Sequence, residues 1–241
     1  MPQLTPPIQA LVFDVFGTVV DWRTPIIDEL TAATSHAGPN LDSDIDGAAP
    51  APELLATLAD DWRRAYGEAT ADVNAGLLPW QTVDHLHRTA LDNLLIHHHL
   101  TALTEDQRNH LNRAWHRLTP WPDAVQGLTA LKQRYTIATL SNGNISLLTN
   151  MAKHAALPWD LILSAELFNH FKPHPDVYTG AAHLLGLHPN EVLMVATHPG
   201  DLRAAATQGL RTAYIPRPLE YGPTRPQPGK ADDDHFDIEV T

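Results

Sequence analysis

The chain has 241 residues and a formal net charge of −12 at neutral pH, with 43% hydrophobic and 18% charged residues. This length is enough for one large domain, or for a core domain that carries a smaller insert. The negative charge excludes a surface that binds nucleic acid, and no apolar run is long enough to cross a membrane. The absence of cysteine excludes disulfides and thiolate chemistry. Since the first residues also lack a signal-peptide pattern, we expect a cytoplasmic protein.

Residues 8–13 form a short apolar run that stops at Asp14, which predicts a buried strand followed by a loop. Similar apolar runs follow at 135–140, 161–163, 192–196 and 212–215. Helical patterns lie between them at 123–134, 145–154, 175–185 and 201–208. Alternating strands and helices predict an α/β fold, a parallel sheet with helices on both faces.

The interval from 21 to 118 interrupts this alternation with helices alone. Apolar side chains recur at helical spacing within 54–66 and again within 84–95. Thr104 and Gln107 have the spacing of a capping box, so a further helix is expected after them. That helix would hold Leu111, Trp115 and Leu118. An all-helical insert directly after the first strand is best interpreted as a cap over the sheet.

The sequence therefore predicts two domains. The catalytic core would comprise residues 1–20 and 119–241, and the helical cap would comprise residues 21–118. The stretch 34–52, rich in Pro, Gly and Asp, predicts a loop inside the cap, and the acidic tail after Gly229 is expected to be weakly ordered.

Polar side chains follow the predicted strands at the edge where open α/β sheets bind ligands. They are Asp14, the pair Ser141 and Asn142, Lys172, and the segment from His198 to Asp201. The surrounding motifs read FDVFGT at 13–18, LSNGN at 140–144, FKPHPDVY at 171–178 and VATHPGDL at 195–202.

These four motifs, in this order over about residues 8–222, resemble those of the haloacid dehalogenase superfamily, and within it the type II 2-haloacid dehalogenases. The resemblance implies a Rossmann-like core with a helical cap and metal-independent hydrolysis of short 2-haloalkanoic acids, without a cofactor. Asp14 would displace halide from C2 to form an aspartyl ester, and water would hydrolyse that ester to release a 2-hydroxy acid. The L form is the expected substrate, with inversion, and a homodimer is a further expectation.

The resemblance also implies roles for the residues beside Asp14. The ammonium of Lys172 would favour the charged form of Asp14 and lower its pKa. Thr18 would hydrogen-bond to Asp14, although a loop or helix-capping hydroxyl is the simpler role. Ser141 and Asn142 would supply donors to the substrate carboxylate, with ordinary turn chemistry as the alternative.

Phe16 separates dehalogenases from phosphatases of the same superfamily. Phosphatases carry at this position a second Asp that protonates the leaving alcohol. They also place an acidic residue directly after the strand equivalent to 192–196 to hold Mg²⁺, whereas this chain offers no carboxylate there before Asp201. A halide leaving group needs no proton, so these absences favour dehalogenation. We place Phe16 and Tyr178 among the substrate-binding residues, with simple packing as the alternative for Tyr178.

The cap is expected to supply a positive group that faces the nucleophile. The segment WRRAY at 62–66 resembles the cap helix on which related dehalogenases carry an arginine after a tryptophan. Arg63 would then receive the halide or bind the substrate carboxylate. Arg64, about 100° further round the helix, is the alternative. Trp62 would form a wall of the pocket, or pack within the cap.

His198 stands where the best-known enzymes of this type have an asparagine. An imidazole is suited to activating water near neutral pH, and a structural histidine at a strand end is the alternative. Asp28 or Glu29 could orient it, while Asp201 is expected to hold Lys172 and its loop rather than act as a base. The run His97–His99 is interpreted as a solvated helix end, and we assign no chemistry to His170, His174 or His183.

Three other functions stay open at this level. They are a Mg²⁺-dependent small-molecule phosphatase, a hydrolase that displaces a non-halide group from a 2-substituted carboxylic acid, and a binding protein without turnover.

Overall fold

The computed structural model describes residues 5–35, 50–225, 227 and 229–240. Its main sheet has six strands in the order β5-β4-β1-β6-β7-β8, and every neighbouring pair is parallel. The strands are β1 (Ala10–Phe13), β4 (Thr136–Ser141), β5 (Leu161–Ser164), β6 (Val192–Ala196), β7 (Arg211–Tyr214) and β8 (Ile238–Glu239). All residues of β1 and β6 are buried, as expected for central strands that are covered on both faces.

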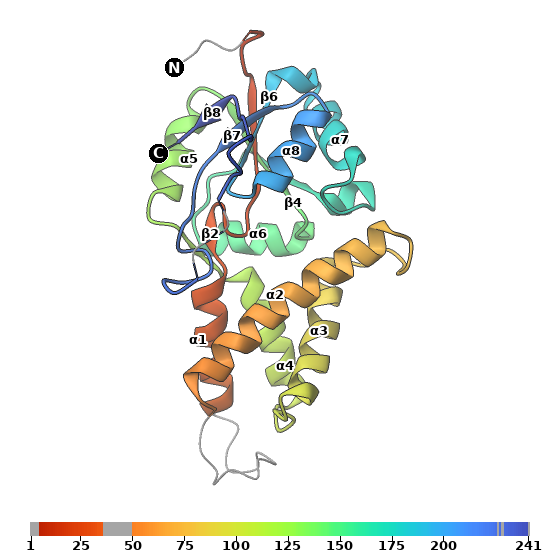
Figure 1. The fold of residues 1–241 in the computed structure, drawn as a ribbon, viewed down its shortest axis with the longest axis vertical. Helices are drawn as coiled ribbons and strands as arrows, with labels where there is room; N and C mark the ends of the chain where they lie inside the picture. The colour runs from red at the N-terminus through yellow and green to blue at the C-terminus, as the bar shows by residue number, and fades with distance from the viewer. Residues whose placement is uncertain (1–4, 36–49, 226, 228, 241) are drawn as a thin grey trace.

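Four α-helices and two 3₁₀-helices connect the strands. They are α5 (Ala124–Lys132), α6 (Ile145–His154), α7 (Pro175–Leu185), α8 (Pro199–Thr207), η2 (Ala165–Phe168) and η3 (Pro189–Glu191). In Figure 1, α5 lies on one side of the strands while α7 and α8 lie on the other. Proline occupies the first turn of both α7 and α8, where the missing N–H has no helical partner to lose. The predicted α/β fold with helices on both faces is confirmed.

The helical cap occupies the lower half of Figure 1. Its helices are α1 (Arg23–Ser35), α2 (Pro52–Asn74), α3 (Val83–His97), α4 (Glu105–Asn112) and η1 (Arg113–His116). The capping box of Thr104 and Gln107 is present, but Trp115 lies in η1 and Leu118 beyond it, so the predicted single helix is interrupted. None of the described helices is both long and apolar enough to span a membrane. Most of the loop predicted at 34–52 lies outside the described residues.

A two-stranded antiparallel ribbon marks the passage between the two halves. It pairs β2 (Val20–Asp21) with β3 (Thr119–Pro120), where the chain enters and leaves the helical part. We therefore infer that the cap comprises residues 21–118 and that its two connections to the core lie side by side.

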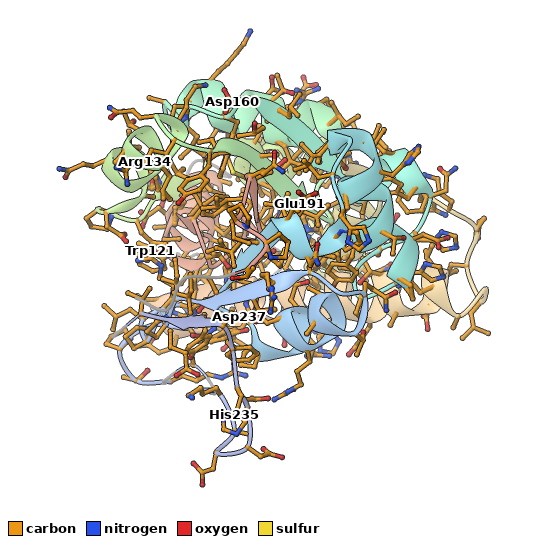
Figure 2. The ribbon with its side chains drawn as sticks, turned by 90° about the horizontal axis from the view of Figure 1, so that it is seen from above. Trp121, Arg134, Asp160, Glu191, His235 and Asp237 are labelled. Atoms are coloured by element: carbon orange, nitrogen blue, oxygen red, sulfur yellow. The ribbon has the colours of Figure 1, made fainter. Side chains whose placement is uncertain are left out.

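The end of the chain departs from expectation. Ile238 and Glu239 form β8 on the edge of the sheet beside β7, although this tail was predicted to be weakly ordered. The Asp237 carboxylate accepts hydrogen bonds from the Thr212 N–H at 2.9 Å and from Arg211 Nη1 at 3.1 Å. Figure 2 shows Asp237 against the sheet and His235 on the segment that projects away from the body. A two-residue strand is too short to give a periodic pattern, so only its partners reveal it.

Candidate active site

A cavity of about 590 Å³ lies where the carboxyl ends of the strands meet the cap. It opens beside β1, the strand flanked by β4 on one side and β6 on the other, which is where open α/β sheets bind ligands. Most of the predicted site residues line it. From the core these are Asp14, Phe16, Ser141, Asn142, Lys172, Tyr178, His198 and Asp201, and from the cap Arg63.

Asp14 is buried at the end of β1 and accepts three side-chain hydrogen bonds. Lys172 Nζ donates to Oδ1 at 3.1 Å, Thr18 Oγ1 donates to Oδ2 at 2.7 Å, and His198 Nδ1 lies 3.0 Å from Oδ2. Burial raises the pKa of Asp14, but Lys172, His198 and Thr18 together outweigh burial and hold the pKa well below its usual range. The carboxylate is therefore ionised and fixed in orientation, as a nucleophile requires.

Lys172 Nζ lies between two carboxylates. It donates to Asp14 at 3.1 Å and to Asp201 Oδ2 at 2.5 Å, and the other oxygen of Asp201 accepts from the Tyr178 hydroxyl at 2.6 Å. Burial lowers the pKa of Lys172, but the two carboxylates raise it by more, so the side chain stays an ammonium. Burial and the charge of Asp201 raise the pKa of Tyr178, so its hydroxyl keeps its proton and stays a hydrogen-bond donor. Asp201 and Tyr178 therefore hold Lys172 against the nucleophile.

The main chain around Lys172 is held by two amide side chains. Asn142 Oδ1 accepts from the Lys172 N–H at 2.7 Å, and Asn142 Nδ2 donates to the Lys172 carbonyl at 3.5 Å. Asn74, at the end of α2, accepts from the Phe171 N–H at 2.9 Å and donates to the Phe171 carbonyl at 2.8 Å. Asn142 was predicted to donate to substrate, whereas its amide is engaged mainly with Lys172.

Ser141 is fully buried at the end of β4, where its Oγ accepts from the Gly143 N–H at 3.3 Å. The hydroxyl hydrogen is free to turn toward the cavity, which Ser141 lines. Phe16 lines the same cavity and packs edge-on to Trp115, with ring centroids 6.0 Å apart. An apolar ring therefore stands two residues after the nucleophile, and it can neither donate a proton nor bind a metal.

Arg63 is the cap cation that faces Asp14. Its guanidinium carbon lies 5.0 Å from the Tyr66 ring centroid and 5.7 Å from that of Trp22. Burial lowers the pKa of Arg63, but the nearby Tyr66 and the carboxylates of Glu220 and Asp14 raise it by more, so it stays charged. Because the guanidinium stacks on aromatic rings in the cavity wall, it is available to an anionic ligand.

Arg64 and Trp62 are oriented differently from Arg63. Arg64 also lines the cavity, but its side chain is 62% exposed and forms ion pairs with Asp61 at 2.8 Å and Glu68 at 3.2 Å. Trp62 is fully buried, donates from Nε1 to the His87 carbonyl at 2.9 Å, and does not line the cavity. Of the two roles expected for Trp62, a pocket wall or packing within the cap, the structure therefore favours packing, because position 62 points to the interior of the cap.

His198 bridges two carboxylates. Its Nδ1 faces Asp14 Oδ2 at 3.0 Å, and its Nε2 lies 3.0 Å from Glu220 Oε1. Glu220 is fully buried and also accepts from Trp22 Nε1 at 3.1 Å and from Gln227 Nε2 at 2.7 Å. Burial lowers the pKa of His198, but its hydrogen bonds to Asp14 and Glu220 and their negative charges outweigh burial and raise that pKa to about 9.

Glu220 replaces the partners that were expected for His198. Glu29 pairs instead with Arg117 at 2.7 Å and with His110 at 3.3 Å, and Asp28 lines a different cavity. Glu220 lies in the irregular segment after β7, in the sequence RPLEYGP, which carries no motif or periodic pattern. In the structure, Gly17 has a φ of +84°, and a Cβ at Gly17 would collide with the Glu220 carboxylate, a close approach that only the fold reveals.

Comparison with known proteins shows the family. A profile described as haloacid dehalogenase-like hydrolase matches residues 8–209. The chain belongs to this family. It is 34% identical over 224 residues to (S)-2-haloacid dehalogenase 1 of Pseudomonas sp. (strain CBS-3). The aligned segment covers 89% of this chain and 88% of that protein. The resemblance inferred from the four motifs is thereby confirmed.

Solved structures agree with this assignment. The defluorinating L-2-haloacid dehalogenase Rha0230 is 41% identical, with a TM-score of 0.89, and covers 100% of this chain and 94% of its own. The L-2-haloacid dehalogenase PA0810 is 42% identical, with a TM-score of 0.85, and covers 97% of this chain and 95% of its own.

In this haloacid dehalogenase-like hydrolase, the carboxylate oxygens around Asp14 suit an ammonium better than Mg²⁺. Asp14 and Asp201 both bind Lys172 Nζ, and Thr197 and His198 supply no carboxylate after β6. Outside the cavity, the described residues contain one group with three potential metal ligands, His170, His174 and Asp176. The two imidazole rings stack with centroids 3.7 Å apart.

Proposed function

We propose that this protein hydrolyses short (S)-2-haloalkanoic acids to 2-hydroxy acids through a covalent ester at Asp14. The observation that carries this proposal is the buried, ionised Asp14 carboxylate, held by Lys172 and Thr18 beside the apolar Phe16. A carboxylate held in this way is a nucleophile, and the absence of a proton donor suits a leaving group that departs as a stable anion. The (S)-2-haloacid dehalogenases among its relatives support the same substrate class.

In the first half-reaction, Asp14 Oδ1 is the attacking oxygen. Oδ2 accepts hydrogen bonds from both Thr18 and His198, whereas among the described residues Oδ1 accepts only that of Lys172. An Oδ1 lone pair forms a bond to C2 of the substrate while the carbon–halogen bond breaks and its electron pair leaves with the halide. Attack from the side opposite the halide inverts C2.

Two groups bind the ends of the substrate in this proposal. Arg63 faces Asp14 from the cap and receives the departing halide, since a fixed guanidinium stabilises an anion strongly where water is scarce. The Ser141 hydroxyl donates to the substrate carboxylate from the end of β4.

A halide-release assay tests the proposed function. Purified protein is given fluoroacetate, chloroacetate, bromoacetate and each enantiomer of 2-chloropropionate, in parallel reactions with and without a chelator. We expect halide and hydroxy acid in equal amounts, a preference for the (S)-enantiomer and no effect of the chelator. Asp14→Asn should lower the rate by at least about 1,000-fold, because an amide is a poor nucleophile. Release of phosphate from p-nitrophenyl phosphate that depends on Mg²⁺, with no halide released, would establish the phosphatase alternative.

Two further expectations belong to this proposal. We propose that the enzyme acts in the cytoplasm, given its cysteine-free composition, and that it forms a homodimer, as the family resemblance implies. Light scattering on the eluting protein measures its mass in solution, and a monomer at assay concentrations would contradict the second expectation.

A further inference from the structure

The loop before α7 brings together two histidines and a carboxylate that the catalytic site does not use. They are His170, His174 and Asp176, in the segment NHFKPHPD at 169–176. The chain turns between the two histidines, because the His174 N–H donates to the Phe171 carbonyl at 2.9 Å. This turn places the two imidazole rings face to face, with centroids 3.7 Å apart and planes inclined by 9°. Their nitrogens therefore point at a common region of space.

The ligand atoms of this group already have nearly the spacing of a metal site. His170 Nδ1 lies 3.6 Å from Asp176 Oδ2, and His174 Nδ1 lies 3.7 Å from the same oxygen. All three ligand atoms lie within 4.8 Å of one another. Zn²⁺ binds imidazole nitrogen and carboxylate oxygen at about 2.0–2.2 Å, so tetrahedral geometry separates neighbouring ligand atoms by about 3.3–3.6 Å. Small rotations of the imidazole rings are enough to reach this spacing.

The types of ligand select the class of cation. Imidazole nitrogen suits Zn²⁺, Ni²⁺ and Cu²⁺, whereas Mg²⁺ and Ca²⁺ prefer a set of oxygen ligands. Two imidazoles and one carboxylate therefore favour a divalent transition-metal ion. Three protein ligands also leave one tetrahedral position for a water molecule.

The group is open to solvent and separate from the catalytic cavity. The side chains of His170, His174 and Asp176 are 39%, 31% and 61% exposed, so an ion can reach them in the folded protein. None of the three lines the cavity. Lys172, between the two histidines, instead directs its ammonium to Asp14. The loop thus presents its lysine to the cavity and the three ligands to solvent.

Binding of a metal ion has to displace two hydrogen bonds. His170 Nδ1 lies 3.0 Å from the Phe168 carbonyl oxygen, and His174 Nδ1 accepts from the Asp176 N–H at 3.3 Å as the N-cap of α7. The ion would also lie at the N-terminal end of α7, where the helix dipole favours anions. Both effects, together with the open fourth position, make the expected affinity weaker than that of a closed four-ligand zinc site.

We propose that His170, His174 and Asp176 bind one divalent transition-metal ion, with Zn²⁺ as the best match in ligand type and spacing. The ion is structural. It joins the residues on both sides of Lys172 to the first turn of α7, the helix from which Tyr178 reaches Asp201. Occupation of the site therefore stabilises the loop and the helix that position the lysine, and takes no part in the chemistry at Asp14.

The first test measures zinc binding to untagged, metal-free protein by competition with a chromophoric chelator. We expect one equivalent of Zn²⁺ to bind with a Kd of about 10 µM or tighter. His170→Gln, His174→Asn and Asp176→Asn should each weaken binding by at least about 10-fold. Asparagine at position 174 retains an oxygen that can cap α7, so loss of binding there reports loss of a ligand. His183→Gln, on the exposed side of α7, is the matched control and should bind as the wild type does.

The second test measures the geometry of the site and its effect on stability. Co²⁺ in the same site should give the strong visible absorption of a tetrahedral complex, and Zn²⁺ should abolish it. At about 100 µM free Zn²⁺, the folding equilibrium constant from urea denaturation should rise by at least about 10-fold in the wild type. It should change by less than about twofold in His174→Asn. Halide release should be equal with and without the ion.

Three results would overturn the inference. They are a zinc Kd weaker than about 10 µM, wild-type affinity in any of the three ligand variants, and reduced affinity in His183→Gln. Each would mean that the ion, if bound at all, lies on other histidines of the chain. The inference does not depend on the proposed function, because zinc binding is measured without substrate. Failure of halide release would leave it standing, and failure of zinc binding would leave the dehalogenase proposal standing.

Discussion

At the scale of single residues, two adjacent arginines on α2 have different surroundings. Both line the cavity, but Arg63 stacks on Tyr66 and Trp22, while Arg64 is largely exposed and paired with Asp61 and Glu68. The difference follows from helix geometry, since one residue further along turns the side chain by about 100°.

We therefore expect Arg63→Gln and Arg64→Gln to behave differently. Loss of a cation that faces the departing halide should lower kcat/KM by about 100- to 1,000-fold. Loss of Arg64, which also lines the cavity but is largely exposed and paired with Asp61 and Glu68, should lower it by less than about 10-fold. Chloride release at several substrate concentrations measures both variants, and equal effects would contradict the assignment of Arg63.

At the scale of elements, the turn after β1 depends on a glycine. Gly17 has a φ of +84°, and its missing Cβ leaves room for the Glu220 carboxylate that holds His198. Gly127, within α5, has open space where a Cβ would be placed.

Gly17→Ala should lower the free energy of unfolding by about 1–3 kcal/mol, because it strains the backbone and displaces Glu220. Gly127→Ala should raise that free energy by about 0.5–1 kcal/mol, since alanine is the better helix former. Urea denaturation measures both. A neutral Gly17→Ala would show that Glu220 is less tightly packed than the contacts indicate.

At the scale of the whole molecule, Asn74 joins the cap to the core beside the active site. Its amide satisfies both the N–H and the carbonyl of Phe171, the residue before Lys172. We expect Asn74→Ala to lower the free energy of unfolding by about 1–3 kcal/mol, because two main-chain groups lose their partner. We also expect kcat to fall by about 10-fold, since small displacements of catalytic groups are costly. Steady-state kinetics and urea denaturation of the same preparation check the two effects.

His198 should also make the stability of the whole protein depend on pH. Its pKa is about 6.5 in the unfolded chain and about 9 in the fold, so the folded state binds the proton more tightly. The stabilisation from this proton is complete below about pH 6.5 and is lost as the pH rises through about 9. The free energy of unfolding should fall across this window in the wild type and change less in His198→Gln. Urea denaturation of the wild type and of His198→Gln at a series of pH values measures this dependence in both proteins. An equal dependence in both would contradict the prediction.

The sequence by itself determined the α/β architecture and most of the site residues at the carboxyl ends of the strands. Alternating strands and helices place the carboxyl ends of parallel strands together, so Asp14, Ser141 and Lys172 could be predicted to meet. The family resemblance implied a role for Phe16, because phosphatases of the superfamily carry a proton donor at this position and an aromatic ring supplies none.

Only the tertiary structure decided which groups complete the site. Trp22 and Glu220 are 198 residues apart yet share a hydrogen bond, and Glu220 rather than Asp28 or Glu29 holds His198. Trp62 faces the interior of the cap, and Asn142 holds the Lys172 main chain. Periodic patterns report how a segment packs locally, whereas the partner of an acidic residue in an irregular segment depends on the path of the entire chain.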